Sequence, residues 1–159
     1  MRIGHGFDVH AFTKGKEIIL GGVKIPFHKS FKAHSDGDVL IHAICDAMLG
    51  SLALGDIGAL FPPSEAQWEG CNSDYFLKEV YKRVQDKGYE LANIDCTIIC
   101  EKPKIRPYVE QIQASIANFL NETKDKISIK ATTTEKLGYC GREEGVAVHV
   151  VSLLNSKNI

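Results

Sequence analysis

The chain has 159 residues, of which 44% are hydrophobic and 25% charged, a composition typical of a folded globular protein rather than a disordered or collagenous one. Nineteen Lys and Arg against twenty Asp and Glu give a net charge of −1, which argues against a surface that binds nucleic acid or an anionic membrane. Five cysteines without a CxxC pair, and an opening with neither a leader nor a long apolar run, predict a cytoplasmic protein with one domain over residues 1–159.

The first third of the chain is expected to begin as sheet and to continue into a buried helix. Alternating or β-branched residues predict strands over 2–10, 17–20 and 23–25. Residues 35–38 (Ser-Asp-Gly-Asp) offer hydroxyl and carboxylate caps just before an apolar run over 39–49, which predicts a capped helix that is buried on most sides. Two glycines and two prolines in 54–65 predict an ordered loop that carries function.

The rest of the chain alternates between helices and strands. Periodicity predicts a helix over 73–87 with Ser73 as its cap, a strand over 90–100, a helix over 108–120, and strands over 126–132 and 145–154. We therefore expect an α/β (α+β) sandwich in which helices pack on one face of a mixed four-stranded sheet. The other face of that sheet needs a cover, and another subunit is the obvious candidate.

A candidate metal site comes from three residues. Asp8 and His10 stand two apart on a strand, so their side chains leave the same face. His42 lies on the otherwise apolar helix, where a polar group needs a buried partner. One carboxylate and two imidazoles suit a zinc ion with an open fourth position, and Asp46 or a neighbouring carbonyl would orient an imidazole. The alternative is that Asp8 pairs with a cation and His42 is a hydrogen-bonded core histidine.

Three further clusters each allow a structural and a functional interpretation. His34 and Ser35 precede the buried helix, where they would cap it or bind an anion. The threonines at 132–134 suit a strand, but they also offer donors to phosphate, with Glu135 free for Mg²⁺. Residues 100–107 form either a rigid surface turn or a base and phosphate pocket. The remaining histidines, at 5, 28 and 149, support no metal assignment.

Four long polar motifs resemble the 2-C-methyl-D-erythritol 2,4-cyclodiphosphate synthase family of the non-mevalonate isoprenoid pathway. They read GHGFDVHAF, AHSDGDVxxHA, ALGDIGxLFP and KATTTEKLGYxGRxEG, in order along nearly the whole chain. The resemblance implies a homotrimer of sandwiches whose sheets face the threefold axis, with active sites shared between subunits. It also implies that 4-diphosphocytidyl-2-C-methyl-D-erythritol 2-phosphate is converted to 2-C-methyl-D-erythritol 2,4-cyclodiphosphate and CMP.

The resemblance also assigns roles to residues of this chain. Asp8, His10 and His42 match zinc ligands, Glu135 matches the ligand of a second divalent ion, Mg²⁺ or Mn²⁺, and His34 and Thr133 match catalytic positions. The implied substrate-binding residues are Asp8, Val9, His10, His34, Ser35, Asp56, Ile57, Gly58, Phe61, Pro62, Pro63, Ser64, Glu65, Cys100, Glu101, Lys102, Pro103, Lys104, Ile105, Arg106, Thr132, Thr133, Thr134, Glu135, Tyr139 and Arg142. The chain departs from the family pattern at residues 63–65, where Asp-Thr-Asp is usual, and at Tyr139, where phenylalanine is common.

Two other functions use the same three metal ligands. In a zinc-dependent phosphohydrolase, a metal-bound water would attack phosphorus and inorganic phosphate would be released. A noncatalytic trimer stabilised by metal would lose stability on chelation but would have no turnover to lose.

Overall fold

The computed structural model describes residues 1–157, so residues 158 and 159 of the expected domain lie outside the described residues. The elements in chain order are β1 (Arg2–Lys14), β2 (Glu17–Leu20), β3 (Val23–Pro26), β4 (Lys29–Phe31), α1 (Val39–Ser51), α2 (Ile57–Leu60), α3 (Ser73–Asp86), β5 (Tyr89–Ile99), α4 (Val109–Leu120), β6 (Ile127–Thr132), α5 (Gly138–Gly141) and β7 (Gly145–Ser156). Single 3₁₀ turns lie at Ala66–Trp68, Arg106–Tyr108 and Lys124–Lys126. In this part of the chain, no helix is both long and apolar enough to cross a bilayer.

The main sheet has five strands in the order β4-β1-β7-β5-β6, and it is mixed because only β5 and β6 run parallel. The predicted strands over 17–20 and 23–25 are confirmed as the β2-β3 hairpin, which forms a two-stranded sheet of its own. The expectation of four strands in the main sheet was wrong. β1 continues past residue 10 to Lys14, and this extension pairs with the three-residue strand β4. So short a strand shows no alternation along the sequence, which is why it was missed.

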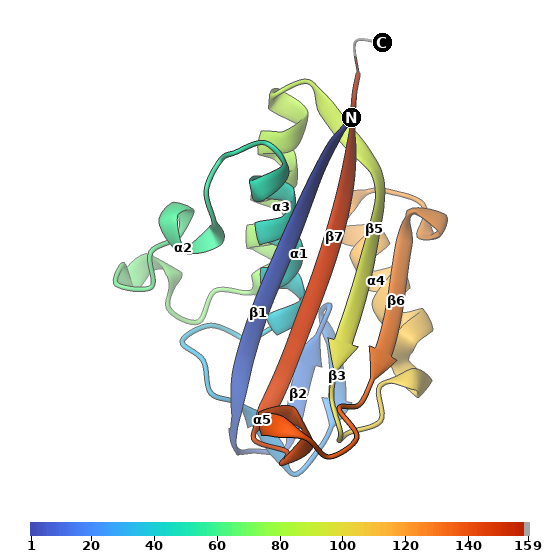
Figure 1. The fold of residues 1–159 in the computed structure, drawn as a ribbon. Coiled ribbons are helices and arrows are strands. Elements are labelled where there is room, and N and C mark those ends of the chain that lie inside the picture. Colours follow the sequence, from blue (N-terminus) through green and yellow to red (C-terminus); the bar gives the residue numbers. More distant parts are fainter. Residues whose placement is uncertain (158–159) are drawn as a thin grey trace.

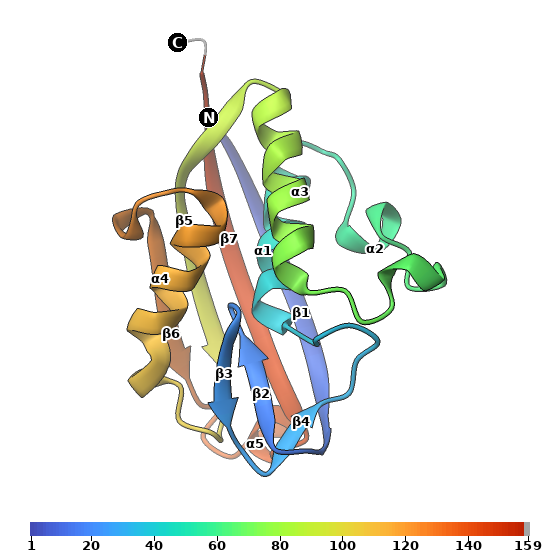
Figure 2. The ribbon, with the colours of Figure 1, turned by 180° about the vertical axis from the view of Figure 1, so that it is seen from behind.

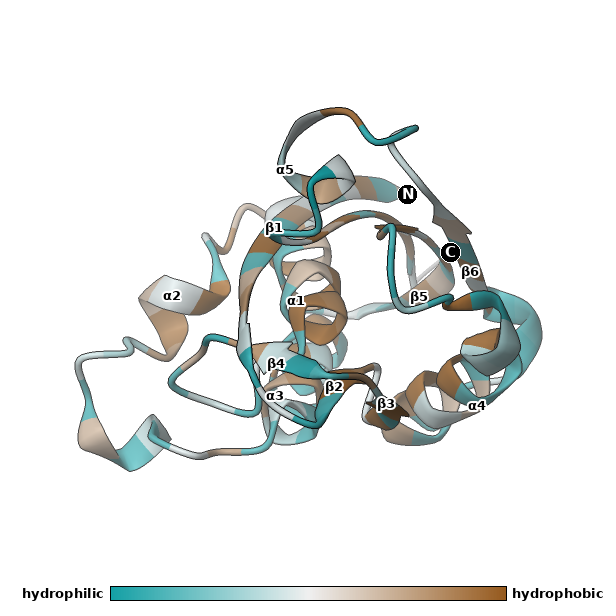
Figure 3. Cartoon of the chain, turned by 90° about the horizontal axis from the view of Figure 1, so that it is seen from below, coloured by the Kyte–Doolittle hydropathy of each residue, from teal (hydrophilic) through white to brown (hydrophobic). Residues whose placement is uncertain are grey.

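Helices α1, α3 and α4 cover one face of the sheet, and the β2-β3 hairpin lies on the same side (Figures 1 and 2). Seen from below, α5 lies across the sheet from these helices (Figure 3). The open face exposes large apolar side chains, with Ile3 70% and Phe7 47% exposed and Val151 at 39%. These exposed residues alternate along β1 and β7 with residues that face the helices.

Helix α1 is buried on most sides and packs directly on the backbone of β1. A Cβ added at Gly4 would lie 1.9 Å from the carbonyl oxygen of Ala47, and one at Gly6 would lie 1.9 Å from that of Ala43. Only glycine therefore permits this approach of helix to strand. The close packing brings His42 of α1 toward the residues that follow Gly6 on β1.

The start of α1 is fixed by Asp38, which is fully buried. Its carboxylate accepts hydrogen bonds from the backbone N–H groups of Ile41 (3.1 Å), Gly21 (2.9 Å) and Gly22 (2.7 Å). Asp38 is thus the member of the predicted capping segment 35–38 that caps the helix, and it also joins the helix to the turn of the β2-β3 hairpin. Burial raises the pKa of Asp38 to about 6, against the lowering effect of the three N–H donors.

Two other local predictions needed correction. The segment 54–65 was predicted as loop, but it contains the single-turn helix α2, whose N-cap Asp56 accepts the N–H of Ala59 at 2.8 Å. Ser73 was predicted to cap the next helix, but the N-cap of α3 is Asn72 and Ser73 is the first helical residue. Ser73 is fully buried, and its hydroxyl makes contacts outside its own helix.

Candidate metal centre and substrate pocket

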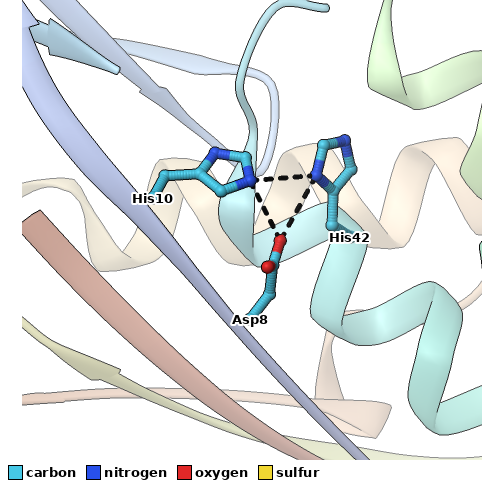
Figure 4. Close-up of side chains that lie close together, drawn as sticks. All are labelled: Asp8, His10 and His42. Atoms are coloured by element: carbon cyan, nitrogen blue, oxygen red, sulfur yellow. Dashed lines mark hydrogen bonds and ion pairs between the residues drawn. The ribbon is translucent and has the colours of Figure 1, made fainter. Parts of the chain in front are cut away.

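Asp8, His10 and His42 converge on one point between β1 and α1 (Figure 4). Oδ2 of Asp8 lies 3.1 Å from Nε2 of His10 and 3.4 Å from Nδ1 of His42, and the two nitrogens are 3.4 Å apart. The alternation of β1 turns both of its residues toward the helix layer, and His42 meets them from near the start of α1. The predicted convergence of the three side chains is confirmed.

These distances fit a tetrahedral metal ion. Four ligands at bond lengths of about 2.0–2.1 Å stand roughly 3.3–3.4 Å from one another. The three separations of 3.1, 3.4 and 3.4 Å lie close to that spacing, and three protein ligands leave a fourth position for substrate or water. The donor set and its geometry therefore suit a divalent metal ion, as the sequence indicated.

Hydrogen bonds on the far side of each imidazole orient the rings. Nδ1 of His10 donates to the carbonyl oxygen of Gly37 at 2.8 Å, so Nε2 of that ring is free to bind a metal. Nε2 of His42 lies 3.1 Å from Oγ of Ser73, whose hydroxyl in turn donates to Asp36. Because the Ser73 hydroxyl proton is donated to Asp36, Oγ of Ser73 accepts a hydrogen bond from the Nε2–H of His42, and Nδ1 of His42 stays unprotonated.

The group that orients His42 differs from the one that the sequence suggested. Oδ1 of Asp46 accepts the backbone N–H of Ile57 at 2.8 Å, so this carboxylate holds the start of α2 instead. Asp36 receives both the hydroxyl of Ser73 and its backbone N–H, the latter at 2.8 Å. Sequence reasoning missed Ser73 because it lies 31 residues from His42 and was read only as a helix cap. An Asp-x-Asp before one helix and a serine that starts the next give no local sign of this contact.

The charges within the cluster reinforce one another. Partial burial acts to raise the pKa of Asp8, but hydrogen bonds and charge from His10 and His42 outweigh it and hold that pKa far below its ordinary value. Burial likewise acts to lower the pKa of His10, and the bond to Asp8 outweighs it, so the pKa of His10 is raised. The site thus stabilises positive charge next to Asp8, which a bound cation would supply.

A pocket of about 450 Å³ opens beside His42. Its lining includes seven residues from the predicted phosphate and substrate positions: His34, Ser35, Ile57, Gly58, Phe61, Pro63 and Ser64. Aromatic rings of Phe61, Trp68 and Phe76 form one wall, and the Phe61 and Trp68 ring centroids are 5.1 Å apart. Trp68 and Phe76 were not predicted as site residues, since an isolated aromatic residue carries no motif.

Some predicted substrate residues hold the pocket loop rather than face the pocket. Asp56 caps α2, and Oε2 of Glu65 accepts the indole N–H of Trp68 at 3.1 Å. Pro62 lies between the lining residues Phe61 and Pro63. Val9 is exposed on the open face of the sheet, on the opposite side from Asp8 and His10. The structure therefore places Val9 away from the metal cluster of its own chain.

The predicted nucleotide-side residues form a second cluster. Oε1 of Glu101 accepts the backbone N–H groups of Thr134 and Lys136, each at 3.1 Å, which ties the 100–106 loop to the 132–135 segment. The backbone N–H of Cys100 donates to the carbonyl oxygen of Thr132 at 2.9 Å. Within the loop Cys100 and Ile105 are buried, Pro103 is half-buried, and the cations Lys102, Lys104 and Arg106 are exposed. The two predicted segments are therefore brought together, with their cations facing solvent.

One chain does not bring the two clusters together. Asp8, Val148, Ile98 and Ala131 follow one another across the strands β1, β7, β5 and β6. Three strand spacings separate Asp8 from Ala131, which is roughly 14 Å. His34 lines the pocket beside the metal cluster, whereas Thr133 belongs to the second cluster, so the two predicted catalytic residues lie apart within one chain.

The last two predicted substrate residues lie near α5. Tyr139 is 40% exposed and lines a small hollow with Phe7, Leu137 and His149. Arg142 is exposed and pairs with Glu144 at 3.0 Å. Neither residue contacts the metal cluster of its own chain.

Comparison with known proteins gives one consistent result. The YgbB family matches residues 1–155. A Haemophilus ducreyi protein named 2-C-methyl-D-erythritol 2,4-cyclodiphosphate synthase is 55% identical over 159 residues, which cover 100% of this chain and 99% of that protein. Among solved structures, the bifunctional IspDF from Campylobacter jejuni aligns with a TM-score of 0.94 and 43% identity over 98% of this chain, which spans 42% of that longer protein. The CDP complex of IspF from Plasmodium falciparum aligns with a TM-score of 0.87 and 37% identity over 99% of this chain and 97% of that one.

Proposed function

The chain belongs to the YgbB family, and we propose that it converts 4-diphosphocytidyl-2-C-methyl-D-erythritol 2-phosphate to 2-C-methyl-D-erythritol 2,4-cyclodiphosphate and CMP. Full-length identity of 55% to a synthase of that name supports the reaction. The observation that carries it in the structure is the convergence of Asp8, His10 and His42 beside the pocket that His34 and Ser35 line.

We propose zinc as the ion held by Asp8, His10 and His42, because a carboxylate and two imidazoles with tetrahedral spacing are a set that zinc favours. Glu135 is proposed to hold a second divalent ion, Mg²⁺ or Mn²⁺, since a lone exposed carboxylate together with substrate phosphates is typical of such sites. When bound, these ions neutralise the negative charge that develops on the diphosphate.

The reaction is an intramolecular phosphoryl transfer. An oxygen of the 2-phosphate attacks the β-phosphorus of the diphosphate, the bond from that phosphorus to the bridging oxygen breaks, and CMP leaves with the bond electrons. No protein nucleophile is needed, so the chain must bind and fold the substrate. Holding the two ends in line contributes on the order of 7–11 kcal/mol to lowering the barrier.

Residues of the pocket perform that folding. His34 and Ser35, which line the pocket beside His42, are placed to bind phosphate oxygens. The aromatic wall of Phe61 and Trp68 excludes water from one side of the pocket. Thr133 is proposed to stabilise the transition state from the nucleotide side, where the CDP bound by the Plasmodium falciparum relative indicates the kind of ligand.

We propose that the protein is a homotrimer whose sheets face the threefold axis and whose active sites lie between subunits. Two observations support this assembly. The metal and nucleotide clusters are three strands apart in one chain, so neither reaches across to complete the other. The open face of the sheet also exposes Ile3, Phe7 and Val151, which a subunit contact would cover.

The proposed compartment is the cytoplasm. All five cysteines, namely Cys45, Cys71, Cys96, Cys100 and Cys140, are free, and oxidising compartments favour paired ones.

The test is a product assay on the purified protein with and without a chelator. We expect CMP and the cyclic diphosphate from the diphosphocytidyl substrate, loss of both after chelation, and recovery when zinc is restored. Release of inorganic phosphate in place of the cyclic product would favour a zinc-dependent phosphohydrolase. No turnover, with chelation lowering only the melting temperature, would favour a noncatalytic trimer stabilised by metal.

A further inference from the structure

Two histidines meet on the open face of the sheet, away from the metal centre described above. Nε2 of His5 on β1 lies 3.0 Å from Nδ1 of His149 on β7. β1 and β7 pair antiparallel so that Phe7 faces His149 and His5 faces Val151, which makes the two histidines diagonal neighbours. Both side chains are exposed, and the Phe7 ring packs on His149 with a centroid separation of 4.7 Å.

The spacing of these nitrogens suits a metal ion. Two imidazole nitrogens bonded to one ion at about 2.0–2.1 Å stand roughly 2.9–3.4 Å apart for bond angles between 90° and the tetrahedral value. The 3.0 Å separation falls in that range, as do the separations in the Asp8 cluster. Within residues 1–157, neither ring makes an ion pair with a carboxylate, so both nitrogens depend on each other for a partner.

His149 sits on a rigid base, and His5 lies on β1, which at this level is paired with β7. β7 is the third of five strands and is paired on both sides, with β1 and with β5, and Thr97 of β5 lies opposite His149. Strand backbone that is hydrogen-bonded on both edges loses little freedom when a ligand binds. The pair is therefore held close to the geometry that chelation needs.

Two imidazoles alone leave most of the coordination sphere of an ion open. Imidazoles from the symmetry-related subunits would fill it. In the proposed trimer, the open faces of three sheets surround the threefold axis. Flat faces around an axis approach it most closely near their midlines, and β7 is one of the two central strands at the level of His149, where the sheet runs β1-β7-β5-β6. His149 and its neighbour His5 would therefore meet their two symmetry copies near the axis.

We propose that the three His5–His149 pairs of the trimer bind divalent transition-metal ions of the zinc, copper or nickel class at the subunit interface. Imidazole nitrogen is the ligand that these ions share. The site is distinct from the Asp8 cluster, which lies on the helix-covered side of β1. This inference rests on the trimer proposed above, and its effect would be to fasten the three subunits together.

The test uses the full-length protein with its Asp8 sites first filled with zinc, and Cu²⁺ as the probe. Native mass spectrometry gives the oligomeric mass and the metal count, and electron paramagnetic resonance reports nitrogen ligands on the copper. We expect one to three additional Cu²⁺ ions per trimer, each with nitrogen hyperfine structure. His149→Gln should weaken this extra binding at least tenfold, and His5→Gln should do the same.

His28→Gln is the matched control, because His28 is an exposed histidine after β3 and belongs to neither site. It should keep the additional copper. A trimeric wild-type protein without nitrogen-bound copper beyond its Asp8 sites would overturn the axial site alone and leave the proposed reaction standing. A monomeric mass would overturn the trimer and the shared site together, while CMP release would still report on the reaction. If either Gln variant fails to assemble into a trimer, the number of additional Cu²⁺ ions bound by the wild-type trimer tests the axial site.

Discussion

The metal half and the nucleotide half of the proposed active site are built in opposite ways. Asp8, His10 and His42 lie on a strand and a helix that touch through glycine, and each imidazole is oriented by a further hydrogen bond. The nucleotide half consists of two segments near the ends of β5 and β6, joined by Glu101 and carrying exposed cations. One half is therefore fixed inside a single chain, whereas the other is presented outward.

This difference fits the chemistry that each half is proposed to perform. A metal site requires ligand atoms held to within a few tenths of an ångström, which only packed elements provide. A nucleotide contact needs access from solvent and a surface that a second subunit can complete. Roughly 14 Å separates Asp8 of the metal half from Ala131, beside the nucleotide half, within one chain.

Two variants, each of which disables one half of the proposed active site, should lose the most activity. His42→Ala should lower the rate of CMP release at least about a thousandfold, since loss of a ligand removes several kcal/mol of charge stabilisation. Glu135→Ala should cause a comparable loss from the other half. Each variant should remain a folded trimer by circular dichroism and native mass.

Mixing the two variants tests whether the two halves of each active site come from different subunits. If active sites lie between subunits, random trimers from equal amounts of the two variants place an intact metal half beside an intact nucleotide half in roughly one quarter of sites, one half times one half. Activity of the mixture after co-refolding should therefore approach a quarter of the wild-type value. A mixture as inactive as its components would show that the metal half and the nucleotide half of each active site come from the same chain.

The second prediction concerns the buried carboxylate that starts α1. The folded-state pKa of Asp38, about 6, lies above its ordinary 3.8, so the folded protein binds this proton more tightly than the unfolded chain. The resulting stabilisation is complete below about pH 3.8 and is lost as the pH rises through about 6. Asp38→Asn, which does not titrate, lacks this dependence.

This pH dependence is measured by urea unfolding of the wild type and of Asp38→Asn between pH 4 and pH 7, with both proteins in the same metal state. The stability of the wild type relative to Asp38→Asn should fall by about 2–3 kcal/mol across that range. Parallel stability curves would contradict the raised pKa. The nucleotide half has no fully buried carboxylate of this kind among the described residues.

The third prediction tests how His42 is oriented. Ser73→Ala removes the acceptor for Nε2 of His42, which frees the ring to take the tautomer that protonates Nδ1. Zinc affinity, measured by competition with a chromogenic chelator, should fall about 10- to 100-fold. Ser73→Thr keeps the hydroxyl and should restore most of the affinity.

Ser51→Ala is the matched control for Ser73→Ala. Ser51 is also a buried serine, but its hydroxyl donates to the carbonyl oxygen of Met48 within α1, far from the ligands. Equal losses of zinc affinity in the Ser73 and Ser51 variants would assign Ser73 a merely structural role.

The smallest expected effect belongs to the nucleotide half. Glu101→Ala removes the acceptor for two backbone N–H groups that face solvent in part, so water replaces most of the bond. KM should rise about three- to tenfold with zinc affinity unchanged. Glu110→Ala, an exposed carboxylate at the start of α4, is the control and should leave both values at the wild-type level. A loss of zinc from Glu101→Ala would mean that the two halves are coupled within one chain.

Much of the fold could be predicted because its signals are local. The alternation of β1, the hairpin glycines and the apolar run after Asp38 each lie within a few neighbouring residues. β4 could not be predicted, since three residues give no period, and α2 was hidden among glycines and prolines. The zinc-ligand candidates followed from spacing on one strand and one helix, and motif resemblance added the loops.

The amino-acid sequence alone indicates which residues are equipped for chemistry, because periodicity places Asp8 and His10 on one face and leaves His42 as a polar group in an apolar helix. Which of these groups meet depends on the three-dimensional packing of the chain. Ser73 reaches His42 across 31 residues, and His5 reaches His149 across 144. Such contacts depend on how strands pair and how helices pack, which are long-range consequences of burying apolar surface and leave no pattern in neighbouring residues.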